Sequence, residues 1–448
     1  MMIDKKKISR RHFLRMAALG TATTALAACL PGATPEGGQE APAPAGDETV
    51  SDAASSPTNG VVEVDFVTFY TGPDGAIMQG IIDQFNDEHE GIKVNFSAPA
   101  WGAEYVTRIQ TAGLAGNPPG VVALHNYEIP PLAQYLYDIN EAVETMGVNK
   151  DDFVNIAWEL PMYEGKLLGA TMSTGTVALY YNKDLFEQAG LDPEKPPTNT
   201  AEFIEAGKAI RALGDDTWGF VRDNGGWLPW YSMNWQNGGD LLTEDGTGVL
   251  FNSQAGIEAA QLEQSFVKEH GFNPPEPAAD RWALMDAGKL GMLFDGPWQL
   301  SRMFQSNAEA GTNFATAPYV TFFDDAPGIQ STSHIYCVTR QEPEDPAQRE
   351  AGLTLISWLL KNGSLEWAKA QAPTNRSVLE QMQNSPDELV RAMVLWVEQA
   401  PQAKFPPYHP QWGQISTMLR EGVELIVYQG DDPTATLAMV VEQSNGLL

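Results

Sequence analysis

Several tryptophans lie beside small polar turns, and these residues suggest a ligand site more clearly than any others in the chain. One aromatic group precedes the turn sequence Asn-Gly-Gly and comprises Trp227, Trp230, Tyr231 and Trp235. Trp298 follows Asp295-Gly296-Pro297, and Trp412 follows a proline-rich segment. An indole gives the C–H face of a pyranose a flat apolar surface, whereas an unpaired buried sugar hydroxyl costs about 1–3 kcal/mol and so needs polar partners. The pattern is typical of a sugar site, although a peptide or osmolyte site could use the same residues.

The same tryptophans could instead belong to the hydrophobic core. Trp227, Trp230 with Tyr231, and Trp235 have a spacing that one face of a helix could carry. For each of them, core packing and ligand contact both remain open. Trp298 is better placed for ligand contact, because a Gly-Pro turn rarely lies in the centre of a core and concave sites are often built from such loops.

The sequence contains no recognisable catalytic motif. It has no GxSxG turn, no phosphate-binding P-loop and no GxGxxG between a strand and a helix. His125 and His334 could act as bases, but no obvious nucleophile is paired with either. The 58 acidic residues make carboxylate pairs common by chance, so a glycosidase pair stays open without being indicated. Tyr180 and Tyr181 would point to opposite faces of a strand, which favours core packing over a phenolate metal site.

Composition limits the class of protein. The chain has 448 residues and a formal charge of -31, so two or three domains are expected, and a nucleic-acid partner is disfavoured because phosphates need clustered Lys and Arg. No apolar run approaches the roughly 20 residues of a membrane-spanning helix. The two cysteines are too few for a disulfide framework or a Cys₄ metal site, and none of the six histidines forms an HExxH pair.

The N-terminal residues 1–28 have the pattern of a targeting segment. A basic start is followed by Ser-Arg-Arg-His-Phe-Leu-Arg, which resembles a twin-arginine export signal, and then by a short Ala- and Thr-rich apolar stretch. Leu-Ala-Ala-Cys at its end resembles the bacterial lipobox, in which Cys29 would receive a lipid. An ordinary N-terminal helix with a chance cysteine is the alternative. Lipidation would leave Cys337, in an apolar run, as a buried and inert thiol.

Residues 29–60 are predicted to be a disordered tether. From Leu30 onward the segment consists mainly of Pro, Gly, Ala, Ser, Thr and acidic residues without any aromatic side chain, so it cannot bury enough surface to offset the entropy of ordering. Together with a lipid on Cys29, the tether predicts an exported protein held at the outer face of a cell membrane.

From residue 61 the pattern predicts an α/β body. Alternating apolar residues at 62–66 and 92–96 predict strands, helical spacing at 77–85 predicts a helix, and Val121–Leu124 reads as a short buried strand. Strands and helices in this order imply a mostly parallel sheet covered by helices, which binds ligands at the carboxyl ends of its strands. The segments Tyr70–Asp74 and His125–Tyr127 follow two such ends.

The second half of the chain is richer in helices. We expect helices at residues 203–213, 351–361 and 415–426, and a last helix beginning at Asp432-Pro433. Strands are expected at 290–294 and 335–339. No internal repeat of fixed period is present.

The order of motifs resembles that of the extracellular solute-binding proteins (family 1) of ATP-driven importers, the group that includes maltose-binding protein. The resemblance runs from about Val62 to Leu448 and depends most on YNKDLFEQAGLDPEKPPT and GKLGMLFDGPWQL; TFYTGPDG, QNGGDLL and HPQW also fit. Two departures are a missing Asp in the run Asn117–Val121, and Gly328–His334 in place of a Gly-Gly segment.

The resemblance implies a type II periplasmic-binding-protein-like fold of two α/β lobes around a ligand cleft. Three crossings would fall near 170–176, 328–334 and 371–377, where the chain has small or breaker residues. Lobe 1 would comprise 61–172 plus 334–372, and lobe 2 would comprise 176–328 plus 376–448. Closure of the two lobes about such hinges would produce the liganded form that a transmembrane permease recognises.

The resemblance also implies ligand-binding residues at positions that match the family's motifs. Trp298 would stack on a sugar face, Asp74 and Asn126 would bind hydroxyls, and Thr174 would line the first crossing. Further candidates are Trp227, Trp230, Arg376 and Tyr408. Asp295 could instead brace the Gly-Pro-Trp turn, Arg376 could pair with a surface carboxylate, and His334 could donate to a hydroxyl or cap its strand.

These observations predict the substrate-binding component of an ABC importer, which captures a mono- or oligosaccharide and works without catalysis, cofactor or metal. Its partners would be the sugar, the permease and, through the lipid, the membrane, with the protein itself a monomer. One alternative is the same receptor for a glycerol-phosphate ester, a polyamine or a compatible solute. A secreted glycoside hydrolase is the remaining alternative.

Overall fold

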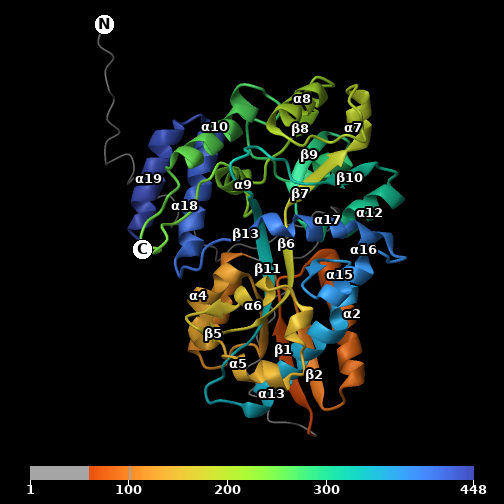
Figure 1. The fold of residues 1–448 in the computed structure, drawn as a ribbon, viewed down its shortest axis with the longest axis vertical. Helices are drawn as coiled ribbons and strands as arrows, with labels where there is room; N and C mark the ends of the chain where they lie inside the picture. Colours follow the sequence, from red (N-terminus) through yellow and green to blue (C-terminus); the bar gives the residue numbers. More distant parts are fainter. Residues whose placement is uncertain (1–59, 100–101) are drawn as a thin grey trace, which may run out of the picture. The chain divides into compact units, whose positions relative to one another are not determined.

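The computed structural model describes residues 60–99 and 102–448, which form two main β-sheets with helices around them (Figure 1). The predicted signal peptide at 1–28, Cys29 and the predicted tether as far as residue 59 lie outside the described residues. Of the two cysteines, Cys337 is described, and it is a buried free thiol. Its burial raises its pKa well above the ordinary value, as expected for an inert core thiol.

The larger sheet has seven strands in the order β12-β6-β11-β3-β1-β2, with β13 beside β11. Its strands are β1 (Val62–Val67), β2 (Ile92–Ser97), β3 (Val121–Leu124), β6 (Ala170–Thr176), β11 (Ile329–Val338), β12 (Ala372–Pro373) and β13 (Ala403–Lys404). β1 pairs in parallel with both β2 and β3, as the strand–helix–strand pattern predicts. β11 runs antiparallel to β3 and β6.

The smaller sheet has four strands in the order β10-β7-β9-β8. Its strands are β7 (Ala178–Asn182), β8 (Trp218–Phe220), β9 (Leu290–Asp295) and β10 (Phe314–Ala317). β7 is antiparallel to both of its neighbours, whereas β8 and β9 are parallel. A separate two-stranded ribbon joins β4 (Met162–Tyr163) and β5 (Lys166–Leu167).

Both main sheets are mixed, so the expectation of mostly parallel sheets was wrong in this respect. The antiparallel pairs of the main sheets are β11 with β3 and β6, β12 with β6, and β7 with β9 and β10, and most of these strands lie next to the places where the chain changes sheet. The chain leaves the larger sheet after Thr176, returns between Ala317 and Ile329, and leaves again after Pro373.

β11 is longer than the sequence predicts, because it begins at Ile329 instead of near residue 335. Its first half is polar, with Gln330, Ser331, Thr332 and Ser333, so it lacks the alternation by which a half-buried strand is recognised. All of β11 is nevertheless buried, because β6 covers one edge and β3 and β13 cover the other.

The expected helices are present, and most differ from prediction by a few residues at their ends. The helices are α2 (Gly72–Glu88), α3 (Ala103–Leu114), α4 (Ile129–Leu132), α5 (Asn140–Thr145), α6 (Ile156–Glu159), α7 (Lys183–Gln188), α8 (Thr200–Arg211), α9 (Pro229–Gln236), α10 (Gln254–Lys268), α11 (Arg281–Asp286), α12 (Leu300–Glu309), α13 (Pro346–Trp358), α14 (Ser364–Trp367), α15 (Arg376–Met382), α16 (Glu388–Ala392), α17 (Val394–Gln399), α18 (Trp412–Glu424) and α19 (Pro433–Asn445). Side-chain caps fix several starts: Asn199 begins α8, and Asp432 begins α19 ahead of Pro433.

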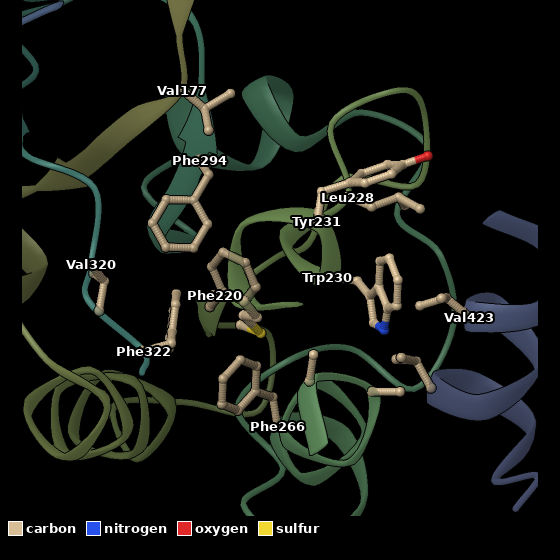
Figure 2. Packing of buried hydrophobic residues seen from close by; sticks show 14 of the residues in the cluster. Val177, Phe220, Leu228, Trp230, Tyr231, Phe266, Phe294, Val320, Phe322 and Val423 are labelled. Atoms are coloured by element: carbon tan, nitrogen blue, oxygen red, sulfur yellow. The ribbon is translucent and has the colours of Figure 1, made fainter. Parts of the chain in front are cut away.

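The core beside the smaller sheet explains most of the aromatic residues of the second half. Trp230, Tyr231 and Trp235 of α9 pack there with Phe251 and residues of α18. Figure 2 shows Trp230 and Tyr231 within this core, where Phe220, Phe266 and Val423 are also labelled. Tyr180 and Tyr181 are buried as well, so core packing is confirmed for both.

Candidate functional site: a cavity lined from both sheets

A cavity of about 530 Å³ is lined by loops and strand ends of both sheets, and this size is typical of small-molecule sites. The larger sheet contributes Phe69–Asp74 after β1, His125 after β3, Thr332 and His334 of β11, and Gln371 before β12. The other wall consists of Trp227, which precedes α9, and of Trp298, Gln299, Arg302 and Gln305, which follow β9. The cavity therefore lies at the ends of β1 and β3, where the sequence pattern predicts ligand contacts.

Trp298 and Trp227 form an aromatic wall of this cavity. Their ring centroids are 4.8 Å apart, and the ring planes are inclined by 41°. The Trp298 indole folds back over Gly296, so closely that a Cβ added at that position would lie 2.1 Å from the ring. The Gly-Pro-Trp sequence thus fixes where the ring lies, and only glycine leaves room for it.

Asp295 holds the turn that carries Trp298. Its carboxylate accepts hydrogen bonds from the backbone N–H of Gly296 at 2.9 Å and from Trp282 Nε1 at 2.9 Å, and it also contacts Arg281 at 3.2 Å. Burial raises the pKa of Asp295, and Arg281 opposes that rise. Asp295 is absent from the cavity lining, which agrees with the alternative that it braces the turn.

Asp74 lies in the first turn of α2 at the opposite wall, and it is only 5% exposed. Its Oδ2 accepts a hydrogen bond of 2.8 Å from Gln371 Nε2. Burial raises the pKa of Asp74 to about 7, although the bond from Gln371 acts in the opposite direction. The carboxyl group therefore titrates near neutral pH.

Three polar oxygens of cavity residues have no hydrogen-bond partner among the described residues. They are Asp74 Oδ1, Thr332 Oγ1 and Gln371 Oε1. Gln371 Oε1 can only accept a hydrogen bond, and so can Asp74 Oδ1 when the carboxyl group is ionised. The Thr332 hydroxyl can accept or donate. An unpaired buried polar group costs about 1–3 kcal/mol, so this wall is suited to a ligand that brings hydrogen-bond donors.

Two histidines add ring nitrogens to the same wall. His125 stacks on Phe69 with 4.3 Å between ring centroids, and its Nδ1 lies 3.2 Å from Glu128 Oε2. His334 Nδ1 lies 2.9 Å from Ser173 Oγ. Burial and the nearby His125 lower the pKa of His334 well below its ordinary value, so this ring is neutral.

Ser173 explains how the neutral His334 ring is oriented. Ser173 Oγ accepts a hydrogen bond of 3.0 Å from Trp367 Nε1, which leaves the serine hydroxyl hydrogen available for His334 Nδ1. If Ser173 donates this hydrogen to Nδ1, Nε2 of the neutral ring carries the hydrogen and can donate. Since His334 lies inside β11, the alternative that it caps a strand does not apply.

The structure brings three of the predicted ligand-binding residues together at the cavity, namely Trp298, Asp74 and Trp227. Trp230 was also expected there, but it lies in the core beside the smaller sheet and is fully buried. Its Nε1 donates to the backbone oxygen of Gly256 at 2.8 Å. Trp227 precedes α9 whereas Trp230 lies in its first turn, which is why only Trp227 reaches the cavity.

The other predicted ligand residues are outside the cavity lining. Asn126 is buried, and its Nδ2 donates to the backbone oxygen of Pro406 at 3.0 Å. Thr174 is half-buried within β6. Arg376 is exposed and donates to the backbone oxygen of Phe153, whereas the Tyr408 hydroxyl donates to the backbone oxygen of Leu160. The contacts of Asn126, Arg376 and Tyr408 are with backbone oxygens of the protein itself.

The sequence patterns missed several lining residues, above all Gln371, Thr332 and Arg302. Gln371 precedes a two-residue strand, and Thr332 lies in the half of β11 that has no apolar alternation. Arg302 follows the Gly-Pro-Trp turn by four residues, so its place one helical turn beyond Trp298 was the available signal. Its Nη2 contacts Asp286 at 2.8 Å.

Comparison with known proteins gives one family match and several similar proteins. The profile of the bacterial extracellular solute-binding proteins matches residues 71–365, more than half of the chain. The chain belongs to this family. A binding protein of Brucella abortus (strain 2308) is 23% identical over 410 residues, covering 88% of this chain and 95% of the relative.

Two further proteins indicate the range of ligands among similar proteins. The cyclic alpha-maltosyl-1,6-maltose binding protein of Arthrobacter globiformis has 22% identity and a TM-score of 0.71, covering 87% of this chain and 99% of its own. The sn-glycerol-3-phosphate-binding periplasmic protein UgpB of Pectobacterium atrosepticum is 26% identical over 234 residues. That match covers 49% of this chain and 52% of UgpB.

Family membership and fold agree with the sequence-based prediction of a two-lobed solute-binding protein of an ABC importer. Members of an extracellular solute-binding family are exported binding proteins. Within residues 60–99 and 102–448, no helix has the length and apolar character needed to cross a membrane. The same residues contain no cluster of three His, Cys, Asp or Glu side chains able to hold a metal ion.

Proposed function

We propose that this solute-binding protein captures a carbohydrate in the cavity between Trp298 and Asp74 and delivers it to a membrane permease. The observation that carries this proposal is the pairing of an aromatic wall with an opposite wall of residues whose buried oxygens lack hydrogen-bond partners. A sugar ring has both properties that such a cavity needs, a C–H face for Trp298 and Trp227 and hydroxyl donors for Asp74, Gln371 and Thr332. The similarity to a cyclic maltosyl-maltose binding protein agrees with this proposal.

The charges around the cavity favour a neutral sugar over a phosphate ester. Arg302 is the only Lys or Arg among the lining residues, and it is already paired with Asp286. Asp74 faces the same space and would repel a phosphate whenever it is ionised. The similarity to UgpB keeps a glycerol-phosphate ester as the rival ligand, and the binding experiment decides between the two.

We also propose that the mature protein is a monomer anchored by a lipid on Cys29 and tethered through residues 29–60. The lipobox-like sequence and the Pro- and acid-rich segment that follows it support this arrangement. The lobes would be 61–172 plus 334–372 and 176–328 plus 376–448. Mass spectrometry of the membrane fraction should find an acylated N-terminal Cys29 peptide, and Cys29→Ser should release the protein; an unmodified peptide would refute the anchor.

Binding of mono- and oligosaccharides, glycerol 3-phosphate, betaine and spermidine to the full chain by calorimetry tests the ligand class. We expect a sugar to bind, and Trp298→Ala to weaken it at least tenfold, or about 1.4 kcal/mol, because the stacking surface is lost. Trp158→Ala is a matched control, since Trp158 of α6 is also a half-buried indole but is absent from the cavity lining. Binding of glycerol 3-phosphate with no response to any sugar would refute the carbohydrate proposal.

A further inference from the structure

The contact between Asp74 and Gln371 leaves two oxygens without a donor. Gln371 Nε2 donates to Asp74 Oδ2 at 2.8 Å, so the amide and the carboxyl group already face each other. Asp74 Oδ1 and Gln371 Oε1 both lack a hydrogen-bond partner among the described residues. Asp74 is 5% exposed and Gln371 is 1% exposed. Two acceptors on facing groups need at least one hydrogen that the described side chains do not supply.

A single proton on Asp74 would supply that hydrogen. A protonated carboxyl group has one O–H donor, and an amide has a carbonyl oxygen that can accept it. If Oδ1 carries the proton and donates to Gln371 Oε1, the two groups form a ring with a second hydrogen bond beside the existing one. An ionised Asp74 instead leaves both oxygens without a donor, and because both are buried in this arrangement, the two side chains must shift before a ligand can reach them.

Asp74 has no ion-pair partner among the described residues. Tyr70 on its own segment, Tyr180 of β7 and Tyr336 of β11 are the titratable groups whose pKa values Asp74 raises, and all three are neutral at physiological pH. The cavity also contains His125, His334 and Arg302, of which Arg302 contacts Asp286. No salt bridge involves Asp74 among the described residues, and its burial raises its pKa into the neutral range.

We propose that Asp74 shares a proton with Gln371 in the free protein and releases this proton when the ligand binds. In the free protein the proton lies on Asp74 Oδ1 and is donated to Gln371 Oε1. When a sugar binds, this O–H bond breaks, the proton leaves to solvent, and two adjacent sugar hydroxyls donate to Oδ1 and Oε1. Nothing is oxidised or reduced, and one proton is released for each ligand bound.

This exchange makes Gln371 a specificity-determining residue for ligands with neighbouring donors. A vicinal diol offers two O–H groups for the two acceptors, whereas a phosphate or carboxylate end offers only acceptors and negative charge. The inference extends the proposed sugar-binding function and depends on it for the identity of the donor. The proton on Asp74 can, however, be observed without any ligand.

The test measures maltose binding to the full chain by calorimetry at pH 6 and pH 8.5, in buffers of low and high ionisation enthalpy. At pH 6 we expect close to one proton released per maltose, seen as a binding heat that differs between the buffers. At pH 8.5 the two heats should agree. Affinity for maltose should fall by up to tenfold for each pH unit below the pKa of Asp74, because each maltose that binds must then displace one proton.

Two variants separate proton exchange from an ordinary contact. Asp74→Asn carries an amide that can pair with Gln371 at every pH, so the proton release should disappear and the weakened affinity should no longer depend on pH. Asp83→Asn removes the same charge from an exposed position of α2 and should keep the proton release. Equal heats in the two buffers at pH 6 with wild-type protein would overturn the proposal.

Failure of sugar binding has a different signature. If maltose does not bind at either pH, the sugar assignment fails for this probe. The proton shared by Asp74 and Gln371 is then tested in the free protein, by following the ¹³C shift of the Asp74 carboxyl carbon with pH. A titration of that carbon in the neutral range supports the held proton. A titration below pH 5 overturns it, whatever the ligand.

Discussion

Replacing Asp74 with asparagine should stabilise the free protein at high pH. The pKa of this acid is raised from 3.8 to about 7 by burial, so the folded state binds its proton more tightly than the unfolded state. The contribution of Asp74 to the free energy of unfolding is therefore most favourable at low pH and declines as pH rises from about 4 to about 7. At 1.36 kcal/mol per pKa unit, the loss above pH 7 amounts to about 4 kcal/mol. Asn avoids this loss, because it is neutral at every pH and can still pair with Gln371.

The assay is urea unfolding of wild-type protein and Asp74→Asn, followed by tryptophan fluorescence at pH 4 and pH 8. We expect similar free energies of unfolding at pH 4 and a gain for the variant at pH 8 of up to about 4 kcal/mol. Asp83→Asn, at an exposed position of the same helix, should show no comparable gain. A variant that is no more stable than wild type at pH 8 would refute the conclusion that Asp74 is buried at an energetic cost.

Three further predictions address other parts of the structure. Gly296→Ala should weaken sugar binding more than tenfold while the melting temperature changes little, because the added Cβ displaces the half-exposed Trp298 ring; unchanged affinity by calorimetry would contradict the proposed stacking. Trp230→Ala should lower the free energy of unfolding by about 3–5 kcal/mol in a urea titration and leave the sugar affinity of the folded protein unchanged. Glu263→Gln should destabilise by a similar amount, about 3–5 kcal/mol, because it leaves Arg222 charged and buried; a neutral effect would show that the 2.7 Å pair is dispensable.

Local patterns in the sequence were sufficient to predict several strands and helices and some residues of both cavity walls. Alternation at 62–66 and the run at 121–124 predicted β1 and β3, and the rule that ligands bind at the carboxyl ends of strands pointed to Tyr70–Asp74 and His125. Trp298 was predicted from the Gly-Pro turn before it. In each case the residue's position follows from its immediate neighbours in the chain, so a short stretch contains the necessary information.

Other residues depend on pairings between distant segments. Gln371 reaches Asp74 only because the short β12 pairs with β6, and neither residue's neighbours indicate that contact. Trp227 and Trp230 are three residues apart, yet the start of α9 places one at the cavity and the other in the core. The mixed strand directions could not be predicted either, because the β-α-β pattern is informative only where consecutive strands are neighbours in one sheet.

Two of the three unpartnered oxygens of the cavity residues lie on segments near the places where the chain passes from one sheet to the other. Thr332 is in β11, which follows the return to the larger sheet, and Gln371 comes just before the chain leaves that sheet again. A ligand can favour one arrangement of two sheets only if it interacts differently with each arrangement. A sugar that donates to Thr332 and Gln371 while stacking on Trp298 would touch residues of both sheets at once, so its binding free energy would depend on how they are placed. For this reason we expect the two walls to act together. A ligand that contacts only one of them would gain affinity without favouring one arrangement of the two sheets.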